Sequence, residues 1–226
     1  MPDSSVFLIT GASTGIGAAT ARHAAAAGHR LVLAARSEDK LEALAAELPE
    51  AIAVRCDVTE WDDQQAVVEK ALDAYGRIDV VFANAGFGAP RGFTKSDVGH
   101  WREMVLTNVY GAALTVRATI DHLKKTRGHL LLTGSVAGRR ALPGSLYSCT
   151  KWAVTAMGEA ARQELNGTGV RVTLIEPGMV DTPFFDDAVE GGLEADDIAR
   201  AVMYAVSQPA HVDVNEILIR PIGQDT

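Results

Sequence analysis

The chain has 226 residues, of which 47% are hydrophobic and 22% are charged, and its formal net charge is -8. This length supports one large core, so we expect a single domain over residues 1–226. Acidic residues spread along the chain argue against a nucleic-acid surface and against a basic membrane-binding face, which leaves a small molecule as the expected partner.

The cysteines and the apolar segments predict the cellular setting. Cys56 and Cys149 are the only cysteines, and neither belongs to a CxxC or His-rich cluster, so we expect neither disulfides nor a metal site. No segment approaches the ~20 apolar residues of a membrane span, and the first residues lack a basic stretch followed by an apolar run. These features predict a soluble, cytoplasmic protein without membrane attachment.

Short apolar runs alternate with longer helical patterns along the chain. Strands are expected at 6–10, 30–36, 51–58, 79–86, 129–135, 170–178 and 215–221. Helices are expected at 15–28, 37–48, 60–76, 96–125, from about 147 onward, and at 194–207. This alternation predicts crossover units and a parallel sheet.

The predicted fold class is α/β. The expected strands are nearly continuous apolar runs, as in a sheet covered by helices on both faces. We therefore expect a Rossmann-like, doubly wound, three-layer sandwich of about seven strands. Irregular loops after Gly86, at 138–144 and at 179–194 follow the carboxyl ends of strands, where open α/β sheets bind ligands.

A glycine-rich turn, "TGASTGIG", follows the first strand directly and leads into an alanine-rich helix. In this context the glycines let the backbone approach a pyrophosphate at the positive end of the helix. The spacing is G-x-x-x-G-x-G, and a tight turn with glycines for packing only is the alternative interpretation. The candidate cofactor contacts here are Gly11, Ser13, Thr14, Gly15, Ile16 and Gly17.

The end of the second strand distinguishes between the two nicotinamide dinucleotides. An acidic residue there would hold the ribose hydroxyls of NAD, but this strand ends in Arg36-Ser37. A guanidinium and a hydroxyl suit a 2′-phosphate, so the sequence favours NADP(H) over NAD(H). The alternative is that Arg36 is a solvated residue that opens the next helix and pairs with Glu38 or Asp39.

A tyrosine and a lysine lie four residues apart in "YSCTK", Tyr147 to Lys151. On a helix this spacing places both side chains on one face, where an ammonium can lower the pKa of a phenol and prepare it for proton exchange with an alcohol or carbonyl. A packed ring beside a solvated charge would have the same spacing, so the pair needs support from the rest of the chain.

That support comes from a series of motifs that resembles the short-chain dehydrogenase/reductase family. "TGASTGIG", "CDV", "NAG", "LTNVYG", "TGS", "YSCTK" and "EPGMVDT" occur in that family's order and spacing, between Thr10 and Thr182. The resemblance implies hydride transfer between a nicotinamide and a small carbonyl or alcohol substrate. It also implies a homodimer or homotetramer, although the alanine-rich helices could instead be buried within one subunit.

The resemblance also assigns roles to individual residues. Tyr147 would be the general acid/base, Lys151 would lower its pKa and hold the nicotinamide ribose, and Ser135 would orient the carbonyl oxygen. Asn108 would hold a helix break and a water in a proton relay. The implied adenosine and nicotinamide contacts are Asp57, Val58, Asn84, Ala85, Gly86, Pro177, Gly178, Val180 and Thr182. Ala83 departs from the Asn-Asn-Ala-Gly of many relatives, which puts one polar contact in doubt.

The loops beside this site leave the substrate open. Phe87, Leu142, Met179, Phe184 and Phe185 suggest an apolar wall, whereas three arginines could contact a carboxylate or simply be solvated. These arginines are Arg91, Arg139 and Arg140. The segment 182–194 contains a Gly-Gly pair and is expected to act as a short lid.

Two functions remain to be compared. An NADP-dependent carbonyl reductase or alcohol dehydrogenase uses the complete set Asn108, Ser135, Tyr147 and Lys151. A non-catalytic sensor that binds NADP has no need of that set. A nucleotide-sugar epimerase or dehydratase fits poorly, because such chains carry a larger carboxyl-terminal region.

Overall fold

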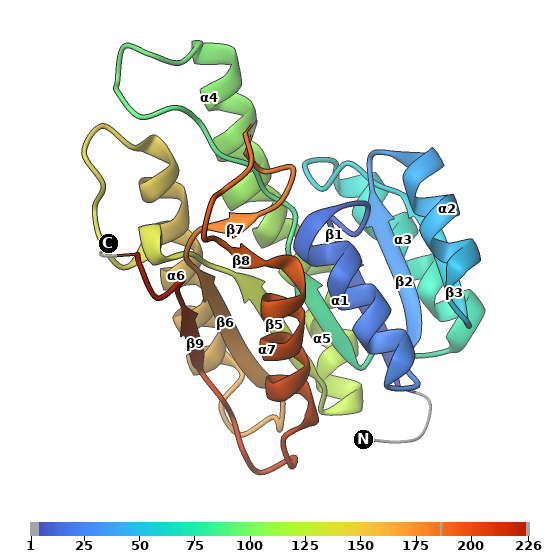
Figure 1. Ribbon diagram of the computed structural model, residues 1–226. Coiled ribbons are helices and arrows are strands. Elements are labelled where there is room, and N and C mark those ends of the chain that lie inside the picture. Colours follow the sequence, from blue (N-terminus) through green and yellow to red (C-terminus); the bar gives the residue numbers. More distant parts are fainter. Residues whose placement is uncertain (1–4, 186, 225–226) are drawn as a thin grey trace.

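A parallel sheet with helices on both faces forms the framework of the molecule (Figure 1). The structure is a computed structural model that describes residues 5–185 and 187–224. Within these residues, the main sheet has seven strands in the order β3-β2-β1-β4-β5-β6-β9, all parallel. The expected doubly wound, three-layer, Rossmann-like arrangement is confirmed.

The elements have the following bounds. The strands are β1 (Val6–Thr10), β2 (Arg30–Ala35), β3 (Ala51–Arg55), β4 (Val80–Ala83), β5 (His129–Thr133), β6 (Arg171–Pro177), β7 (Val180–Asp181), β8 (Leu193–Glu194) and β9 (Glu216–Ile219). The α-helices are α1 (Gly15–Ala26), α2 (Glu38–Glu47), α3 (Trp61–Tyr75), α4 (Val98–Val105), α5 (Ala112–Thr126), α6 (Leu146–Glu164) and α7 (Ala195–Ser207). The π-helix η1 (Leu106–Gly111) and the 3-10 turn η2 (Val136–Gly138) complete the list.

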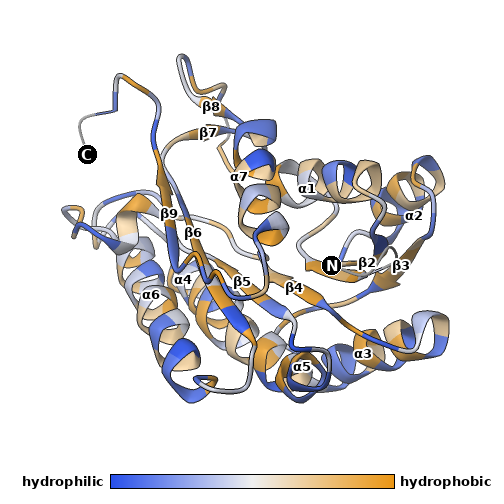
Figure 2. Ribbon diagram, turned by 90° about the horizontal axis from the view of Figure 1, so that it is seen from below, coloured by the Kyte–Doolittle hydropathy of each residue, from blue (hydrophilic) through white to orange (hydrophobic). Residues whose placement is uncertain are grey.

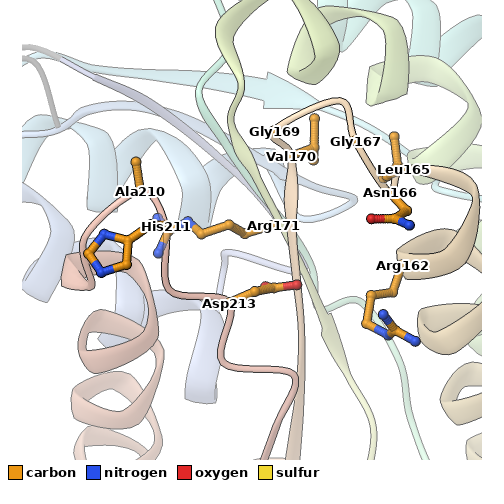
Figure 3. A pocket seen from close by; sticks show the side chains of 10 residues that line it. All are labelled: Arg162, Leu165, Asn166, Gly167, Gly169, Val170, Arg171, Ala210, His211 and Asp213. Atoms are coloured by element: carbon orange, nitrogen blue, oxygen red, sulfur yellow. The ribbon is translucent and has the colours of Figure 1, made fainter.

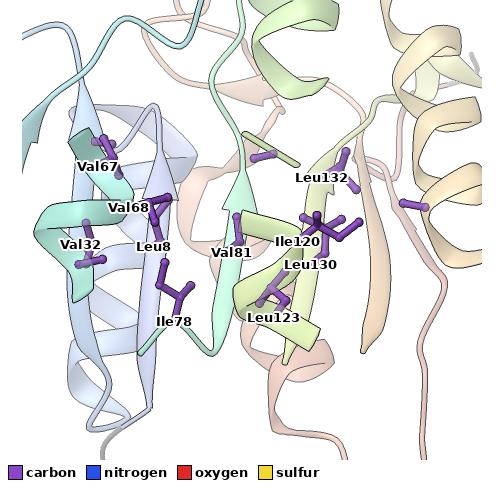
Figure 4. Close-up of a cluster of buried hydrophobic side chains, with 14 of the residues drawn as sticks. Leu8, Val32, Val67, Val68, Ile78, Val81, Ile120, Leu123, Leu130 and Leu132 are labelled. Atoms are coloured by element: carbon purple, nitrogen blue, oxygen red, sulfur yellow. The ribbon is translucent and has the colours of Figure 1, made fainter. Parts of the chain in front are cut away.

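Side chains that alternate along each strand fill two separate cores. Leu8 of β1 packs with α3 and α5 on one face, in the cluster of Figure 4, whereas Phe7 and Ile9 pack with α1, α2 and α7 on the other. Figure 2 shows the hydrophobic colouring along the strands between the two helical layers. Burial of both faces explains why the strands are continuous apolar runs in the sequence.

The carboxyl ends of the strands form the upper edge of the sheet in Figure 1. The strand order reverses between β1 and β4, so the chain leaves these two neighbouring strands toward opposite faces. Such a reversal opens a crevice outside the carboxyl ends, which is where ligands bind in doubly wound sheets. The glycine turn and the loops after β4, β5 and β6 all lie at this edge.

Two segments differ from the sequence-based expectation. The expected helix 96–125 has three parts, because η1 between α4 and α5 makes a π-helical turn. The loop 179–194 contains β7 and β8, which pair with each other; position 186 in that loop lies outside the described residues. The amide of Leu193 donates to the Met179 carbonyl oxygen (2.9 Å), so the two ends of the loop 179–194 are held together.

Candidate active site

The glycine turn forms a backbone cradle at the amino end of α1. Gly11 and Gly15 have φ of +65° and +53°, and a Cβ on Gly17 would lie 2.2 Å from the Gly11 carbonyl oxygen. The N-cap residue Thr14 makes no side-chain capping bond, and the first turn of α1 has no acidic residue. The open N–H groups and the close backbone fit the pyrophosphate of a dinucleotide.

The ends of β2 and β3 bring two arginines and a carboxylate together. Arg36 is exposed directly after β2, and Ala35 pairs in register with Arg55 at the end of β3. Burial alone would raise the pKa of Asp57, but hydrogen bonds from Thr59 and the charges of Arg36 and Arg55 outweigh it and lower that pKa. Positive charge therefore gathers beside the candidate adenosine site.

Asn84 ties the glycine turn to the neighbouring strand. Its amide nitrogen donates to the carbonyl oxygens of Thr10 (3.1 Å) and Gly11 (3.3 Å), and its amide oxygen accepts from the Thr133 hydroxyl (3.0 Å). Both amide hydrogens are thus used within the protein. The side chain fixes the edge that Ala85 and Gly86, its successors, line.

Lys151 lies under this edge, on the first turns of α6. The side chain is buried, and Nζ donates to the Thr133 carbonyl oxygen (2.7 Å). A Cβ on Gly86 would lie 3.7 Å from Nζ and 3.0 Å from Oδ1 of Asn108. Burial lowers the pKa of the Lys151 ammonium to about 8, which leaves it mostly charged at neutral pH.

Tyr147 shares the face of α6 with Lys151, as the four-residue spacing predicts. Lys151 Nζ is 5.7 Å from the centroid of the phenol ring. Burial raises the pKa of Tyr147 to about 12, and a hydrogen bond with Ser135 acts in the opposite direction. The expectation that Lys151 brings this pKa below its ordinary value is therefore not met in the structure, because desolvation of the phenolate is the larger effect.

Ser135 approaches the phenol from the loop after β5. Its hydroxyl accepts from the Ala137 amide (3.1 Å) and lies 3.4 Å from the Pro177 carbonyl oxygen. These two contacts fix the hydroxyl between η2 and the end of β6. Because Ser135 also bonds the phenol, the two hydroxyl groups lie side by side.

Asn108 lies in the π-helix η1 and is buried. Its amide donates to the Phe87 carbonyl oxygen (2.9 Å) and to the Thr150 hydroxyl (3.1 Å), and it accepts from the Phe87 amide (3.0 Å). The expected helix break is a π-helical turn in which the chain stays helical. π-helical turns of this kind are frequent at functional sites.

The segment after β6 closes the crevice against the glycine turn. The Gly178 amide donates to the Ile219 carbonyl oxygen (2.7 Å), and the Met179 amide donates to Oε1 of Gln224 (2.8 Å). Thr182 comes close to the turn, since a Cβ on Gly15 would lie 3.3 Å from the Thr182 Cβ. The structure thus brings the expected nicotinamide loop, including the buried Val180, beside the expected pyrophosphate cradle.

Aromatic rings form a wall above the phenol. Phe184 packs edge-on against Tyr147 with ring centroids 5.5 Å apart, and Phe185 packs against Phe184 at 5.0 Å. Phe87 contacts the ring of His100, which also bonds the Gly88 carbonyl oxygen (2.8 Å). An apolar lining therefore faces the position of a substrate carbon chain.

One of the three candidate arginines is committed to the protein itself. Arg139 Nε lies 2.7 and 2.9 Å from the two carboxylate oxygens of Glu176, and the same guanidinium pairs with Glu216. Arg139 is therefore not placed to bind a substrate carboxylate. Arg91 is exposed, and both Arg91 and Arg140 lie in loops beside the site.

A separate hollow of about 370 Å³ lies at the amino-terminal edge of the sheet (Figure 3). The buried Arg171 in its wall donates to the carbonyl oxygens of Ala205 (3.1 Å), Gln208 (3.2 Å) and Val206 (3.1 Å), which end α7. This guanidinium caps a helix rather than serving a ligand.

The sequence reasoning missed Glu176, Thr133, His100 and Gln224. A signal for Glu176 was present, because a lone acidic residue in an otherwise buried strand must be paired. Gln224 carries no comparable signal, since its contact with Met179 depends on how the chain returns after β9.

Comparisons with known proteins agree with this geometry. A family model described as short chain dehydrogenase matches residues 5–191. An uncharacterised oxidoreductase of Staphylococcus epidermidis is 38% identical over 223 residues, or 96% of this chain and 97% of the relative. An alcohol dehydrogenase from the archaeon Thermococcus sibiricus, solved with 5-hydroxy-NADP, has TM-score 0.93 and 36% identity over 99% of both chains. A 3-ketoacyl-(acyl-carrier-protein) reductase from Brucella melitensis, solved with NADH, has TM-score 0.90 and 27% identity, covering 96% of this chain and 97% of that one.

Proposed function

Because this chain belongs to the short-chain dehydrogenase family, whose members are oxidoreductases that act on CH–OH or C=O groups, we propose that it is an NADP(H)-dependent carbonyl reductase or alcohol dehydrogenase. The observation that carries the proposal is a continuous set of contacts at the carboxyl edge of the sheet: Ser135 bonds Tyr147, Tyr147 lies beside Lys151, and Lys151 and Asn108 lie beside Gly86. A protein that only binds a dinucleotide has no need of a buried ammonium beside a phenol.

The cofactor would lie along this edge, from the two arginines to the aromatic wall. The cradle of Gly11, Gly15 and Gly17 would hold the pyrophosphate, Asp57 the adenine, and Lys151 with Thr182 the nicotinamide end. When bound, the nicotinamide supplies or accepts the hydride. Solved relatives carry 5-hydroxy-NADP or NADH, which supports a nicotinamide cofactor without choosing between the two forms.

The protein residues would handle the proton and the developing charge. Tyr147 would donate its phenolic proton to the substrate oxygen, and Ser135 would hold the same oxygen by its hydroxyl. The Lys151 ammonium would stabilise the phenolate that remains, because an opposite charge nearby favours the ionised form. Because cellular NADPH is normally kept reduced, reduction of a carbonyl is the direction we propose, and the protonated phenol would supply its proton.

The aromatic side chains beside Tyr147 indicate the class of substrate. Phe87, Phe184 and Phe185 suit an apolar or partly apolar ketone or aldehyde, and a 3-oxo acid would need a cation, for which Arg91 and Arg140 remain candidates. The solved relatives include an alcohol dehydrogenase and a 3-ketoacyl-(acyl-carrier-protein) reductase, which supports both of these substrate classes as candidates.

Replacement of Arg36 by alanine tests the proposed preference for NADP. We expect NADPH binding to weaken about 10- to 100-fold, because a charge-assisted bond to a phosphate contributes about 1.5–3 kcal/mol, and NADH binding to stay within about threefold. Nicotinamide fluorescence gives both dissociation constants, and Arg200→Ala, an exposed arginine on α7, is the control. Equal or tighter NADH binding by the wild type would contradict the preference.

We also propose that copies of this chain associate through α5 and α6. Tyr110, just before α5, and Trp152 of α6 are exposed to 49% and 46%, and Val105 lies nearby at the end of α4. Burial of such side chains favours association, so a homodimer or homotetramer is expected in light scattering of the purified protein. A monomer at micromolar concentration would contradict this proposed association.

Among the described residues, none of the helices has the length and apolar composition of a membrane span. We propose that the protein acts in the cytoplasm.

A further inference from the structure

A carboxylate is buried at the end of β6, where the sequence otherwise reads as apolar strand. Glu176 has no exposed surface and precedes Pro177, whose carbonyl oxygen contacts Ser135. A buried charge is strongly unfavourable unless it is paired and hydrogen-bonded. The partners of Glu176 therefore show what this carboxylate holds in place.

Two other segments contact this carboxylate directly, and β9 joins them through Arg139. Arg139, which follows η2, contacts both of its oxygens through Nε at 2.7 and 2.9 Å. Thr155 of α6 lies with its hydroxyl 3.3 Å from Oε1. The guanidinium of Arg139 also pairs with Glu216 of β9. We call this group, Arg139, Thr155, Glu176 and Glu216, the Glu176 clamp.

The clamp lies directly behind the groups that face the substrate. A Cβ on Gly134, the neighbour of Ser135, would lie 2.9 Å from Cγ of Glu176, so the Gly134 backbone packs directly against the Glu176 side chain. A Cβ on Gly138 would lie 2.7 Å from the Lys151 carbonyl oxygen, so η2 rests on the helix that carries Lys151. Thr155 is one helical turn beyond Lys151 on the same face of α6.

We propose that the Glu176 clamp positions Ser135 and the Tyr147–Lys151 face of α6 for proton transfer, and that Arg139 and Glu176 are positioning residues of the reaction. The inference rests on the proposed function. A buried ion pair adds little net stability compared with apolar residues of the same size, so its contribution here is the fixed geometry of two loops and a helix. Arg139 suits this task because its planar fork fixes direction as well as distance.

The expected consequence is a loss in kcat with little change in binding. A displacement of about 1 Å in a reacting group can lower a rate about 10²-fold, and a loosened clamp should allow smaller shifts. We therefore expect Glu176→Gln to lower kcat about tenfold or more. The Michaelis constant for the carbonyl substrate and the dissociation constant of NADPH should stay within about threefold, since none of the four clamp side chains is itself among the proposed ligand contacts.

The experiment compares wild type, Glu176→Gln, Arg139→Lys and Tyr147→Phe. Glu159→Gln is the matched control, because it removes one partner of an exposed ion pair on α6, the helix that carries Tyr147 and Lys151. Each variant is assayed for kcat and KM, for NADPH binding by fluorescence, for its melting temperature, and for the pH profile of alcohol oxidation. Arg139→Lys keeps the charge but loses the fork, so it tests the same geometry if Glu176→Gln does not fold.

The outcomes separate three cases. The proposal is supported if a folded variant binds NADPH normally but has a kcat at least tenfold lower. In that variant the rate of alcohol oxidation should also begin to rise at a higher pH than in the wild type, because Ser135 no longer bonds the phenol. The proposal is overturned if kcat and the pH profile match those of Glu159→Gln, or if kcat falls only in step with the melting temperature. If the wild type itself shows no Tyr147-dependent turnover, the proposed function fails rather than the clamp.

Discussion

Replacement of Tyr147 by phenylalanine is expected to lower kcat by about 10²- to 10⁴-fold, the usual contribution of general acid/base catalysis. The phenyl ring keeps its packing against Phe184, so the fold and the aromatic wall should be preserved. NADPH binding should stay within about threefold, because the hydroxyl makes at most one hydrogen bond to the cofactor.

This prediction is checked by steady-state rates on a panel of ketones, aldehydes and 3-oxo acids, alongside NADPH titration. Tyr204→Phe, which alters an exposed tyrosine on α7, is the control and should behave as the wild type. Full turnover by Tyr147→Phe would exclude the phenol as the proton donor. NADPH binding without turnover on the whole panel, even in the wild type, would favour a sensor.

Replacement of Lys151 by methionine should separate activity from stability. Loss of the ammonium removes the charge that stabilises the phenolate, so we expect kcat to fall about 10²- to 10³-fold. Burial of that ammonium, however, opposes folding, as its pKa of about 8 in place of 10.5 indicates. The difference corresponds to about 3 kcal/mol at neutral pH, partly offset in the variant by the unpaired Thr133 carbonyl oxygen.

The free energy of unfolding of the wild type should change with pH because Lys151 titrates at different pH values in the folded and unfolded states. Between pH 8 and pH 10.5 the unfolded wild type holds the lysine proton whereas the folded protein has released it, so wild-type stability rises with pH in this window. Lys151→Met lacks this contribution. Its stability relative to the wild type should therefore be greatest at pH 7 and should fall by about 2–3 kcal/mol at pH 10.

Urea unfolding of both proteins at the two pH values measures this difference directly. Lys124→Met, which removes an exposed lysine of α5, is the control and should show no such trend. A constant difference between wild type and Lys151→Met would mean that the ammonium is solvated in solution. The same result would contradict the idea that burying the Lys151 ammonium lowers the folding stability of the protein in return for a catalytic charge.

Most of the fold could be predicted from the sequence because periodicity and turn residues agree at every element. The apolar runs fall on strands buried on both faces, and the glycine turn predicts the start of α1 correctly. The helix over 96–125 shows the limit. Apolar spacing predicts a helix there, but it does not distinguish an α-helical turn from the π-helical turn at η1, which depends on the contacts of Asn108 with Phe87.

The candidate site could be predicted less completely. The order of the motifs predicts that Ser135, Tyr147 and Lys151 lie close together. Ser135 follows a strand, and Tyr147 and Lys151 begin the next long helix, so all three lie at the carboxyl edge of the sheet. It did not predict the pKa of the phenol, because desolvation depends on the Phe184 wall and the surrounding burial. Nor did it predict that Arg139 turns inward, since a loop arginine and a buried strand glutamate meet only in three dimensions.

The π-helix η1 can also be regarded as one residue inserted into an ordinary helix. Deletion of Leu106 or Thr107, which precede Asn108, would restore the α-helical register and rotate everything that follows by about 100° relative to α4. Asn108 would then turn away from Phe87 and Thr150 while the helix itself lost no hydrogen bond. Homologous chains that lack this extra residue should therefore show a one-residue gap in this segment, and they should hold the residue at the position of Asn108 differently.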